Sequence, residues 1–159
     1  MPAGAYLHDP LTIKSISGDD ATAQHSAGCL AVSSDGTIYR YCLATVAWTV
    51  VDGALRQAAA TNGYDLAPTS TTAAGEQVLG AAVAAVTIAH YGWATAYGKV
   101  AAMVAATGGW TAQLAIVGGV TASRMLNYAS ATHTAAGPAG TALETKAADA
   151  AGAVILRCL

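Results

Sequence analysis

The four histidines and three cysteines are the side chains of this sequence that most readily bind a metal or attack a substrate. Their spacing does not favour zinc, because no histidine lies three to five residues from another and no Cys-x-x-Cys motif occurs. His25 and Cys29 are four residues apart, as on one face of a helix, but we expect a loop histidine and a strand cysteine. The other members of the set are His8, His90, His133, Cys42 and Cys158. We therefore predict no metal site.

The carboxylates also lack the spacing of a reaction centre. Only two glutamates occur, Glu76 and Glu144, so a hydrolase with paired carboxylates would need scattered aspartates. Asp19 and Asp20 follow Gly18, but no EF-hand spacing follows, and we expect a solvated turn. The sequence contains neither a phosphate-binding loop ending in Lys-Ser or Lys-Thr nor a Gly-x-Ser-x-Gly elbow. We predict that the protein is not an enzyme, with no catalytic residue and no cofactor.

Composition points to a protein that works through contact area. Of the 159 residues, 54% are hydrophobic and 10% are charged, where an average domain has about 25% charged residues. So few charges protect a surface poorly against association, so we expect partners to cover much of it. The net charge of −2 argues against binding to nucleic acid, which requires a basic patch.

Membrane insertion is also not expected. The uncharged run between Lys99 and Arg124 is interrupted by glycines, threonines and Gln113, so it is only mildly apolar. The first ten residues, MPAGAYLHDP, have no basic region followed by an apolar core, and we expect no signal peptide.

The segment CLAVSSDGTIYRYC, from Cys29 to Cys42, predicts a β-hairpin. Asp35-Gly36 is a preferred two-residue turn, because both residue types tolerate a positive φ angle. A turn there sets the register, and the second and third of its pairs share one apolar face. The three pairs are Ser34 with Thr37, Val32 with Tyr39, and Leu30 with Tyr41.

The stretch YGWATAYGK, residues 91–99, alternates large and small side chains. This period of two predicts a strand with an aromatic face and a face of glycine and alanine that admits a close neighbour. Trp93, Tyr97, Val100 and Val104 also have helical spacing, but Gly92 and Gly98 disfavour that alternative.

The remaining segments complete a mostly β fold, a sandwich or barrel-like domain with long loops of small residues. We expect strands at residues 46–55 and in the final run AVILRCL, loops at residues 58–75 and 129–140, and room for a helix at residues 119–131. Pro2, Pro10 and Gly18 punctuate a segment of weak periodicity. We therefore divide the chain into an extended N-terminal arm, residues 1–27, and a single β-rich domain, residues 28–159.

Three segments resemble elements of tailed-phage capsid decoration (cement) proteins. They are DGTIYRYCLAT, YGWATAYGKVAAMV and the closing GTALETKAADAAGAVILRCL, which together cover about half of the chain. Residues 1–30 and 58–75 are not accounted for by the resemblance.

The resemblance implies a virion structural protein on the capsid exterior, present in the host cytoplasm during assembly. Its partner would be the major capsid protein, and such proteins are often homotrimers that clamp neighbouring capsid subunits. Binding the assembled shell and not the free subunits would stabilise the shell by mass action. We expect the arm at residues 1–27 to contact neighbours.

Two other functions stay open. One is a β-sandwich module that binds glycans by stacking sugars on Trp48, Trp93 or Trp110. Exposed tryptophans would favour it and buried ones would exclude it. The other is a different virion part, such as a tail or head-fibre subunit.

The resemblance also bears on the cysteines. In the predicted hairpin register Cys29 and Cys42 face each other at a non-hydrogen-bonded site, with Cα atoms about 4.5 Å apart. That lies within the range of about 4.4–6.8 Å that a disulfide spans. A phage protein folds in a reducing cytoplasm, so we expect two adjacent free thiols that can oxidise outside the cell, with Cys158 left over.

Overall fold

The computed structural model describes residues 16, 18–58, 64–69, 77–118, 123–128 and 137–158. Its regular structure is almost entirely β, which confirms the predicted fold class. The strands of the described residues are β1 (Leu30–Val32), β2 (Ile38–Ala44), β3 (Ala54–Gln57), β4 (Asp65–Pro68), β5 (Val78–Ala82), β6 (Tyr91–Val104), β7 (Ala115–Gly118), β8 (Met125–Asn127), β9 (Gly140–Ala142) and β10 (Ala151–Arg157).

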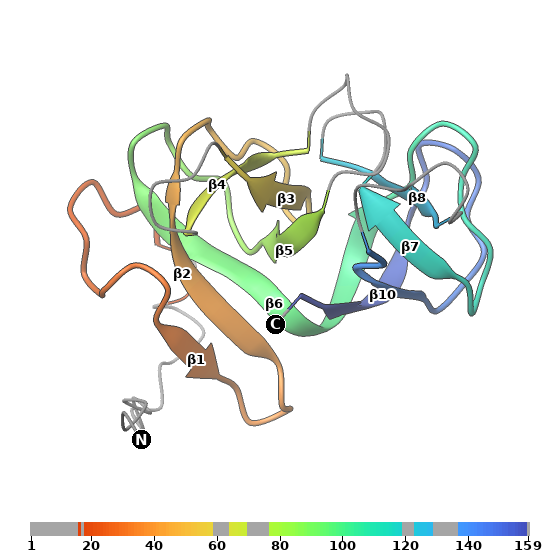
Figure 1. The fold of residues 1–159 in the computed structure, drawn as a ribbon, viewed down its shortest axis with the longest axis horizontal. Helices are drawn as coiled ribbons and strands as arrows, with labels where there is room; N and C mark the ends of the chain where they lie inside the picture. The colour runs from red at the N-terminus through yellow and green to blue at the C-terminus, as the bar shows by residue number, and fades with distance from the viewer. Residues whose placement is uncertain are drawn as a thin grey trace.

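Five of these strands form a closed barrel, which we call the first barrel. Its order is β2-β4-β3-β5-β6, and β2 also pairs with β6, which closes the ring. The β2–β4 pairing is parallel and the other four are antiparallel. Strand β1 extends the sheet beyond β2 (Figure 1).

The second barrel starts from the same long strand. Its order is β6-β10-β9-β7-β8, and a parallel bridge from Ala105 to Met125 connects β8 back to the end of β6. The amide of Ala106 donates to the Met125 carbonyl at 2.7 Å across this closure. Gly98, with a φ angle of 117°, lies where the pairing of β6 passes from β2 to β10. A side chain rarely adopts that φ angle, so glycine suits this position. Figure 1 shows β6 running through both barrels.

The two barrels have the same topology. Replacing β2, β3, β4, β5 and β6 by β6, β7, β8, β9 and β10 converts the first strand order, with its parallel pair, into the second. In each barrel, two loops meet at one end through a two-residue bridge. We call residues 45–53 and 83–90 the first loop end, and residues 105–114 and 143–150 the second loop end. Trp48 bridges Val86 in the first, and Trp110 bridges Lys146 in the second.

Individual hydrogen bonds repeat between the loop ends. Ala44 donates to the His90 carbonyl and accepts from Ala89, as Ala105 donates to Ala150 and accepts from Asp149. Residues with positive φ angles also recur at equivalent places, in the pairs Ala89 with Asp149 and Asp52 with Gln113. The chain therefore contains an internal structural repeat, which was not predicted from the sequence. The signal lies in two matching patterns, Gly80-x-Ala82 with Gly92, and Gly140-x-Ala142 with Gly152.

The alternation in β6 follows from the barrel core. Trp48 fills the first barrel, and a Cβ added to Gly92 would meet its ring at 3.3 Å. The glycine and alanine face of β6 therefore leaves room for Trp48. The opposite face packs Trp93 against Tyr41 outside the barrel. The predicted strand is confirmed here, and the helical alternative is wrong.

The predicted hairpin is present, but its register is wrong by one residue. The observed pairs are Leu30 with Arg40, Ala31 with Tyr39 and Val32 with Ile38. The turn has three residues rather than two: Ser33 donates to the Thr37 carbonyl, and Gly36 takes a φ angle of 82°. The Asp35 carboxylate accepts from the Thr37 amide at 3.0 Å, which stabilises the longer turn. As a result Ala31 is buried, whereas Leu30 and Val32 are exposed.

Three other sequence predictions need correction. Residues 45–53 form a loop around Trp48, and the expected strand at 46–55 begins only at Ala54, because Asp52 turns the chain with a φ angle of 58°. The expected loop at 58–75 contains β4, which closes the first barrel. The helix considered at 119–131 is replaced by β8. The final strand is confirmed as β10.

The described part of the N-terminal arm lies against its own domain. Asp20 forms an antiparallel β-bridge with Tyr91, and the backbone amide of Gln24 donates to the Tyr41 hydroxyl at 3.1 Å. Residues 1–15 and 17 lie outside the described residues, so contact of the arm with neighbouring subunits stays a prediction.

Candidate functional site

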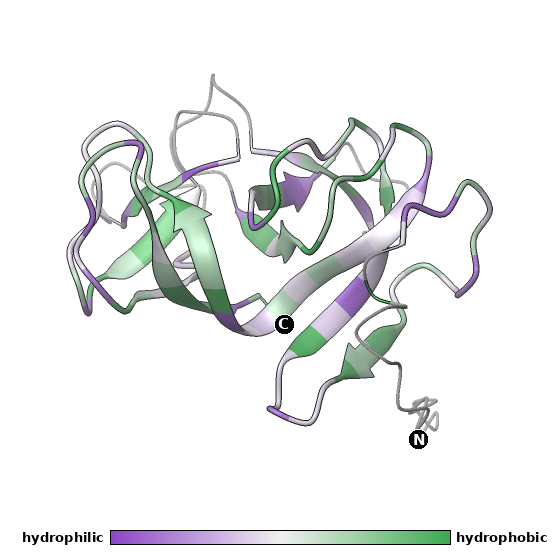
Figure 2. Cartoon of the chain, turned by 180° about the vertical axis from the view of Figure 1, so that it is seen from behind, coloured by the Kyte–Doolittle hydropathy of each residue, from purple (hydrophilic) through white to green (hydrophobic). Residues whose placement is uncertain are grey.

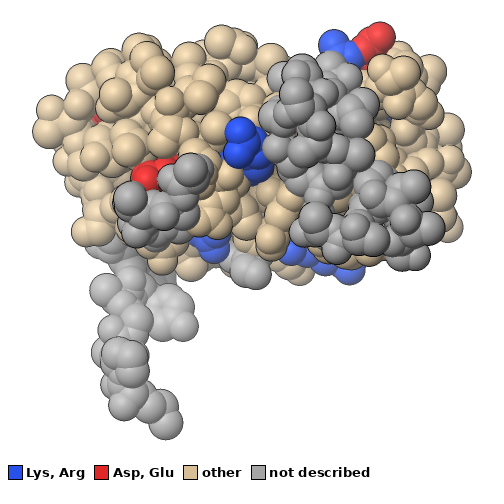
Figure 3. All heavy atoms as spheres, turned by 45° about the horizontal axis from the view of Figure 1, so that its top comes forward, with Lys and Arg blue, Asp and Glu red and all other residues tan. Residues whose placement is uncertain are grey.

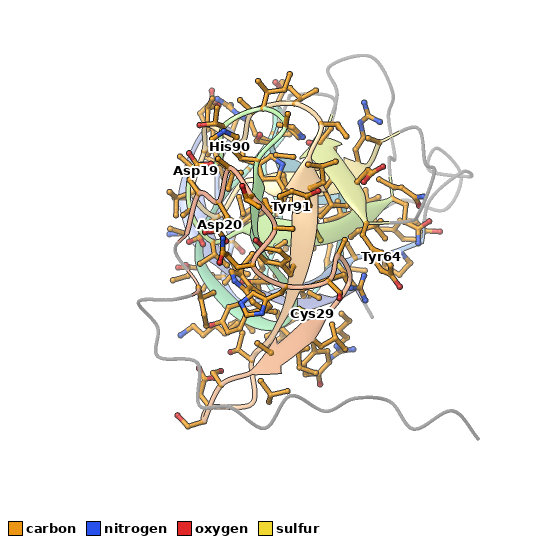
Figure 4. The ribbon with its side chains drawn as sticks, turned by 90° about the vertical axis from the view of Figure 1, so that its left-hand side faces the viewer. Asp19, Asp20, Cys29, Tyr64, His90 and Tyr91 are labelled. Carbon is orange, nitrogen blue, oxygen red and sulfur yellow. The ribbon has the colours of Figure 1, made fainter. Side chains whose placement is uncertain are left out.

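Asp19 connects the N-terminal segment to the first loop end. Its carboxylate accepts from the Thr87 amide at 2.9 Å and the Thr87 hydroxyl at 2.7 Å, and lies 2.9 Å from His90 Nδ1. These hydrogen bonds, chiefly those from Thr87, lower the pKa of Asp19. Figure 4 shows Asp19 beside His90, with Asp20 and Tyr91 next to them. Asp19 was expected in a solvated turn, but its carboxylate instead binds Thr87 of the first loop end.

Asp20 and His25 hold the same segment against aromatic rings. The Tyr41 hydroxyl donates to Asp20 Oδ2 at 2.7 Å, and burial raises the Tyr41 pKa. The His25 ring lies edge-on to Tyr41 and Trp93, with ring centroids 5.1 and 5.4 Å away. His25 is a loop residue with a packing role, as expected.

The cysteines do not form the predicted facing pair. The Tyr41 amide donates to the Cys29 carbonyl at 3.0 Å, so Cys29 lies opposite Tyr41. Cys42, the next residue, points to the other face and packs inside the first barrel. Cys29, Cys42 and Cys158 are all free thiols. Burial raises the pKa of Cys42 to about 12 and that of Cys158 to about 11.

No cluster of metal-binding side chains assembles in the described part of the chain. There, no group of three His, Cys, Asp or Glu side chains gathers in a geometry that could hold a metal ion. His8, Glu76 and His133 lie outside the described residues. The absence of catalytic, cofactor and metal sites from the whole chain stays a prediction.

Two hollows occur on the described surface. The larger, of about 400 Å³, is an open depression at the first loop end, lined by Asp19, Trp48 and Thr87 among others. The smaller, of about 150 Å³, is lined by Arg40, Arg157 and Cys158. Its rim includes Gln77 and Gly137, each of which adjoins a stretch outside the described residues.

The first loop end exposes a group of branched apolar side chains. Val46, Val50, Val51 and Ile88 are 52%, 38%, 56% and 57% exposed. Figure 2 shows that apolar residues recur along these loops. Side chains of this kind are ordinarily buried, and a group of them at one end of a molecule marks an interaction surface. We missed them because the Val-rich run before Asp52-Gly53 matches a strand pattern.

The electrostatics of the first loop end are slightly acidic. Its two loops contain neither Lys nor Arg. Asp52 accepts from the Ala102 amide at 3.1 Å, and partial burial raises its pKa. Asp19 adds a second carboxylate at the margin. Figure 3 shows a face of the molecule on which charged side chains are few.

The three tryptophans offer no platform for sugars. Trp48, Trp93 and Trp110 are each 1% exposed, and each packs in the core. The described residues also contain no helix that is long and apolar enough to span a membrane.

Comparison with other proteins leaves the fold and the surface as the basis for a function. No protein-family model matches this chain, and no curated protein matches it either.

Proposed function

We propose that this protein is a capsid decoration (cement) protein, a non-enzymatic virion component that binds the outer surface of a tailed-phage capsid. The observation that carries the proposal is the exposure of Val46, Val50, Val51 and Ile88 together at one end of a molecule with few charges. Such a surface favours stable contact with another protein over catalysis or binding of nucleic acid.

The barrels suit a protein that works by contact. Strand β6 belongs to both, so the described chain forms one continuous sheet that can transmit load between attached subunits. The partner is the major capsid protein, and the assembly is a homotrimer on the capsid exterior. Binding that requires neighbouring capsid subunits in their assembled arrangement stabilises the shell by mass action.

The glycan-binding alternative loses its main support, because all three tryptophans are buried. A tail or head-fibre subunit remains the second candidate, since the same surface would serve there.

Co-sedimentation tests the proposal. The purified protein is mixed with DNA-free shells of the phage that encodes it, with its tails, and with unassembled major capsid protein. We expect saturable binding to shells alone, and a higher melting temperature of the decorated shells. Binding to tails alone, or equal binding to free capsid subunits, would contradict the proposal.

A further inference from the structure

The internal repeat allows each surface residue of the first loop end to be compared with a partner on the same backbone. Four positions carry the comparison. Hydrogen bonds and positive φ angles fix three of the equivalences, and Val46 is counted forward from Ala44 and its equivalent Ala105. The pairs are Val46 with Thr107, Val50 with Thr111, Val51 with Ala112, and Ile88 with Ala148.

The exposed apolar side chains are therefore not a requirement of the fold. At these positions the second loop end has threonine or alanine, although its first loop has one more residue before the tryptophan and one fewer after it. Its own exposed apolar side chains, Leu114 and Leu143, lie at other positions. The first-loop-end side chains remain 38–57% exposed, so contacts within the chain bury only part of their apolar surface. The exposed part of these side chains is available for contact with a partner.

The two loop ends also differ in charge. At the second loop end Lys146 pairs with Glu144 at 3.1 Å, and Arg124 pairs with Asp149. These pairs are neutral overall and exposed to water. The first loop end has Asp52 and the neighbouring Asp19 but no Lys or Arg in its loops. It therefore has an apolar centre with an acidic margin.

We infer that the first loop end, with four exposed branched apolar side chains, is the surface that docks onto the capsid. The occupant is a protein surface with an apolar centre and Lys or Arg at its rim, which complements the carboxylates of Asp19 and Asp52. Two first loop ends would not pair with each other, because their acidic margins would come together. The inference rests on the proposed function and specifies its interface.

The test exchanges the residues of one end for those of the other. The variant Val46→Thr/Val50→Thr/Val51→Ala/Ile88→Ala installs the second-barrel side chains, and Thr107→Ala/Thr111→Ala is the matched control. Circular dichroism and the melting temperature check that both remain folded. Binding to DNA-free shells is measured for each at about 0.05 M and about 0.5 M salt.

The exchange variant should bind shells at least about tenfold more weakly, since interface centres carry most of the binding energy. The control should bind like the wild type, and wild-type affinity should fall at high salt as the rim charges are screened. Wild-type binding with an unaffected exchange variant would overturn the inference and leave the proposed function standing. Absence of wild-type binding to shells would overturn both.

Discussion

Trp48 and Trp110 occupy equivalent positions at the loop ends of the two barrels, but only one of them satisfies its indole nitrogen. Trp48 Nε1 donates to the Leu66 carbonyl at 3.4 Å, whereas Trp110 Nε1 is buried without a hydrogen-bond partner among the described residues. Both rings are 1% exposed, each in the core of its own barrel, so the pair compares a satisfied with an unsatisfied indole nitrogen at similar burial.

Replacing each tryptophan by phenylalanine should therefore have unequal effects. Trp48→Phe removes a hydrogen bond to the Leu66 carbonyl, which keeps those from the Thr45 amide and hydroxyl, whereas Trp110→Phe removes an unsatisfied donor. We expect the free energy of unfolding to fall by about 1 kcal/mol more for Trp48→Phe. Chemical denaturation of the two variants measures the difference. Equal losses would mean that Trp110 Nε1 has a partner.

Gly92 and Gly152 form a second equivalent pair with different neighbours. A Cβ at Gly92 would lie 2.4 Å from Val86 Cγ2, and one at Gly152 would lie 2.6 Å from Lys146 Cγ. Val86 is buried and short, but the Lys146 side chain can move into water. Gly92→Ala should cost about 1–3 kcal/mol through overpacking, and Gly152→Ala clearly less. Adding Val86→Ala to Gly92→Ala should restore part of the loss; no rescue would place the strain elsewhere.

The Asp19 contact should contribute a pH-dependent stability. Hydrogen bonds from Thr87 lower the pKa of Asp19 in the folded protein, so its contribution is complete above the ordinary value of about 3.9. It is lost as the pH falls through the lowered pKa. Melting temperatures of the wild type and Asp19→Asn should differ at about pH 5 and converge as the pH falls below the lowered pKa of Asp19. A difference that persists at low pH would show that the carboxylate charge is not the cause.

The thiols should react in a fixed order. Cys29 is partly exposed with a raised pKa, whereas Cys42 and Cys158 are buried, with pKa values of about 12 and 11. We expect a thiol reagent to label Cys29 slowly in the native protein and all three cysteines after denaturation. Mass spectrometry counts the labels, and Cys29→Ser should abolish native labelling. A Cys29–Cys42 disulfide after mild oxidation would contradict the observed hairpin register.

Local patterns predicted local structure well. The alternation of residues 91–99 placed β6, and the Asp35-Gly36 pair placed the first hairpin. The register failed because the Asp35 side chain favours a three-residue turn, and this choice depends on a hydrogen bond rather than on hydrophobic pattern. That shift of one residue also removed the expected contact between the cysteines.

The larger architecture could not be predicted from those patterns. β4 and β8 are short, and the parallel pairings that close the barrels join residues far apart in the chain. The repeat was missed because its two halves share little beyond Trp48 with Trp110 and the glycines that admit a close neighbour. The exposed valines of residues 45–53 were predicted to lie in a strand for a related reason, because a run of valines in a loop has the same sequence pattern as a strand.

The shared strand has a consequence for how such chains can lengthen. The second barrel adds only β7 to β10, because β6 is at once the last strand of one barrel and the first of the next. By the same rule β10 occupies in the second barrel the place that β6 occupies in the first, so four more strands paired from it would build a third barrel. Duplication of a four-strand segment would therefore lengthen the molecule without leaving a linker between its barrels.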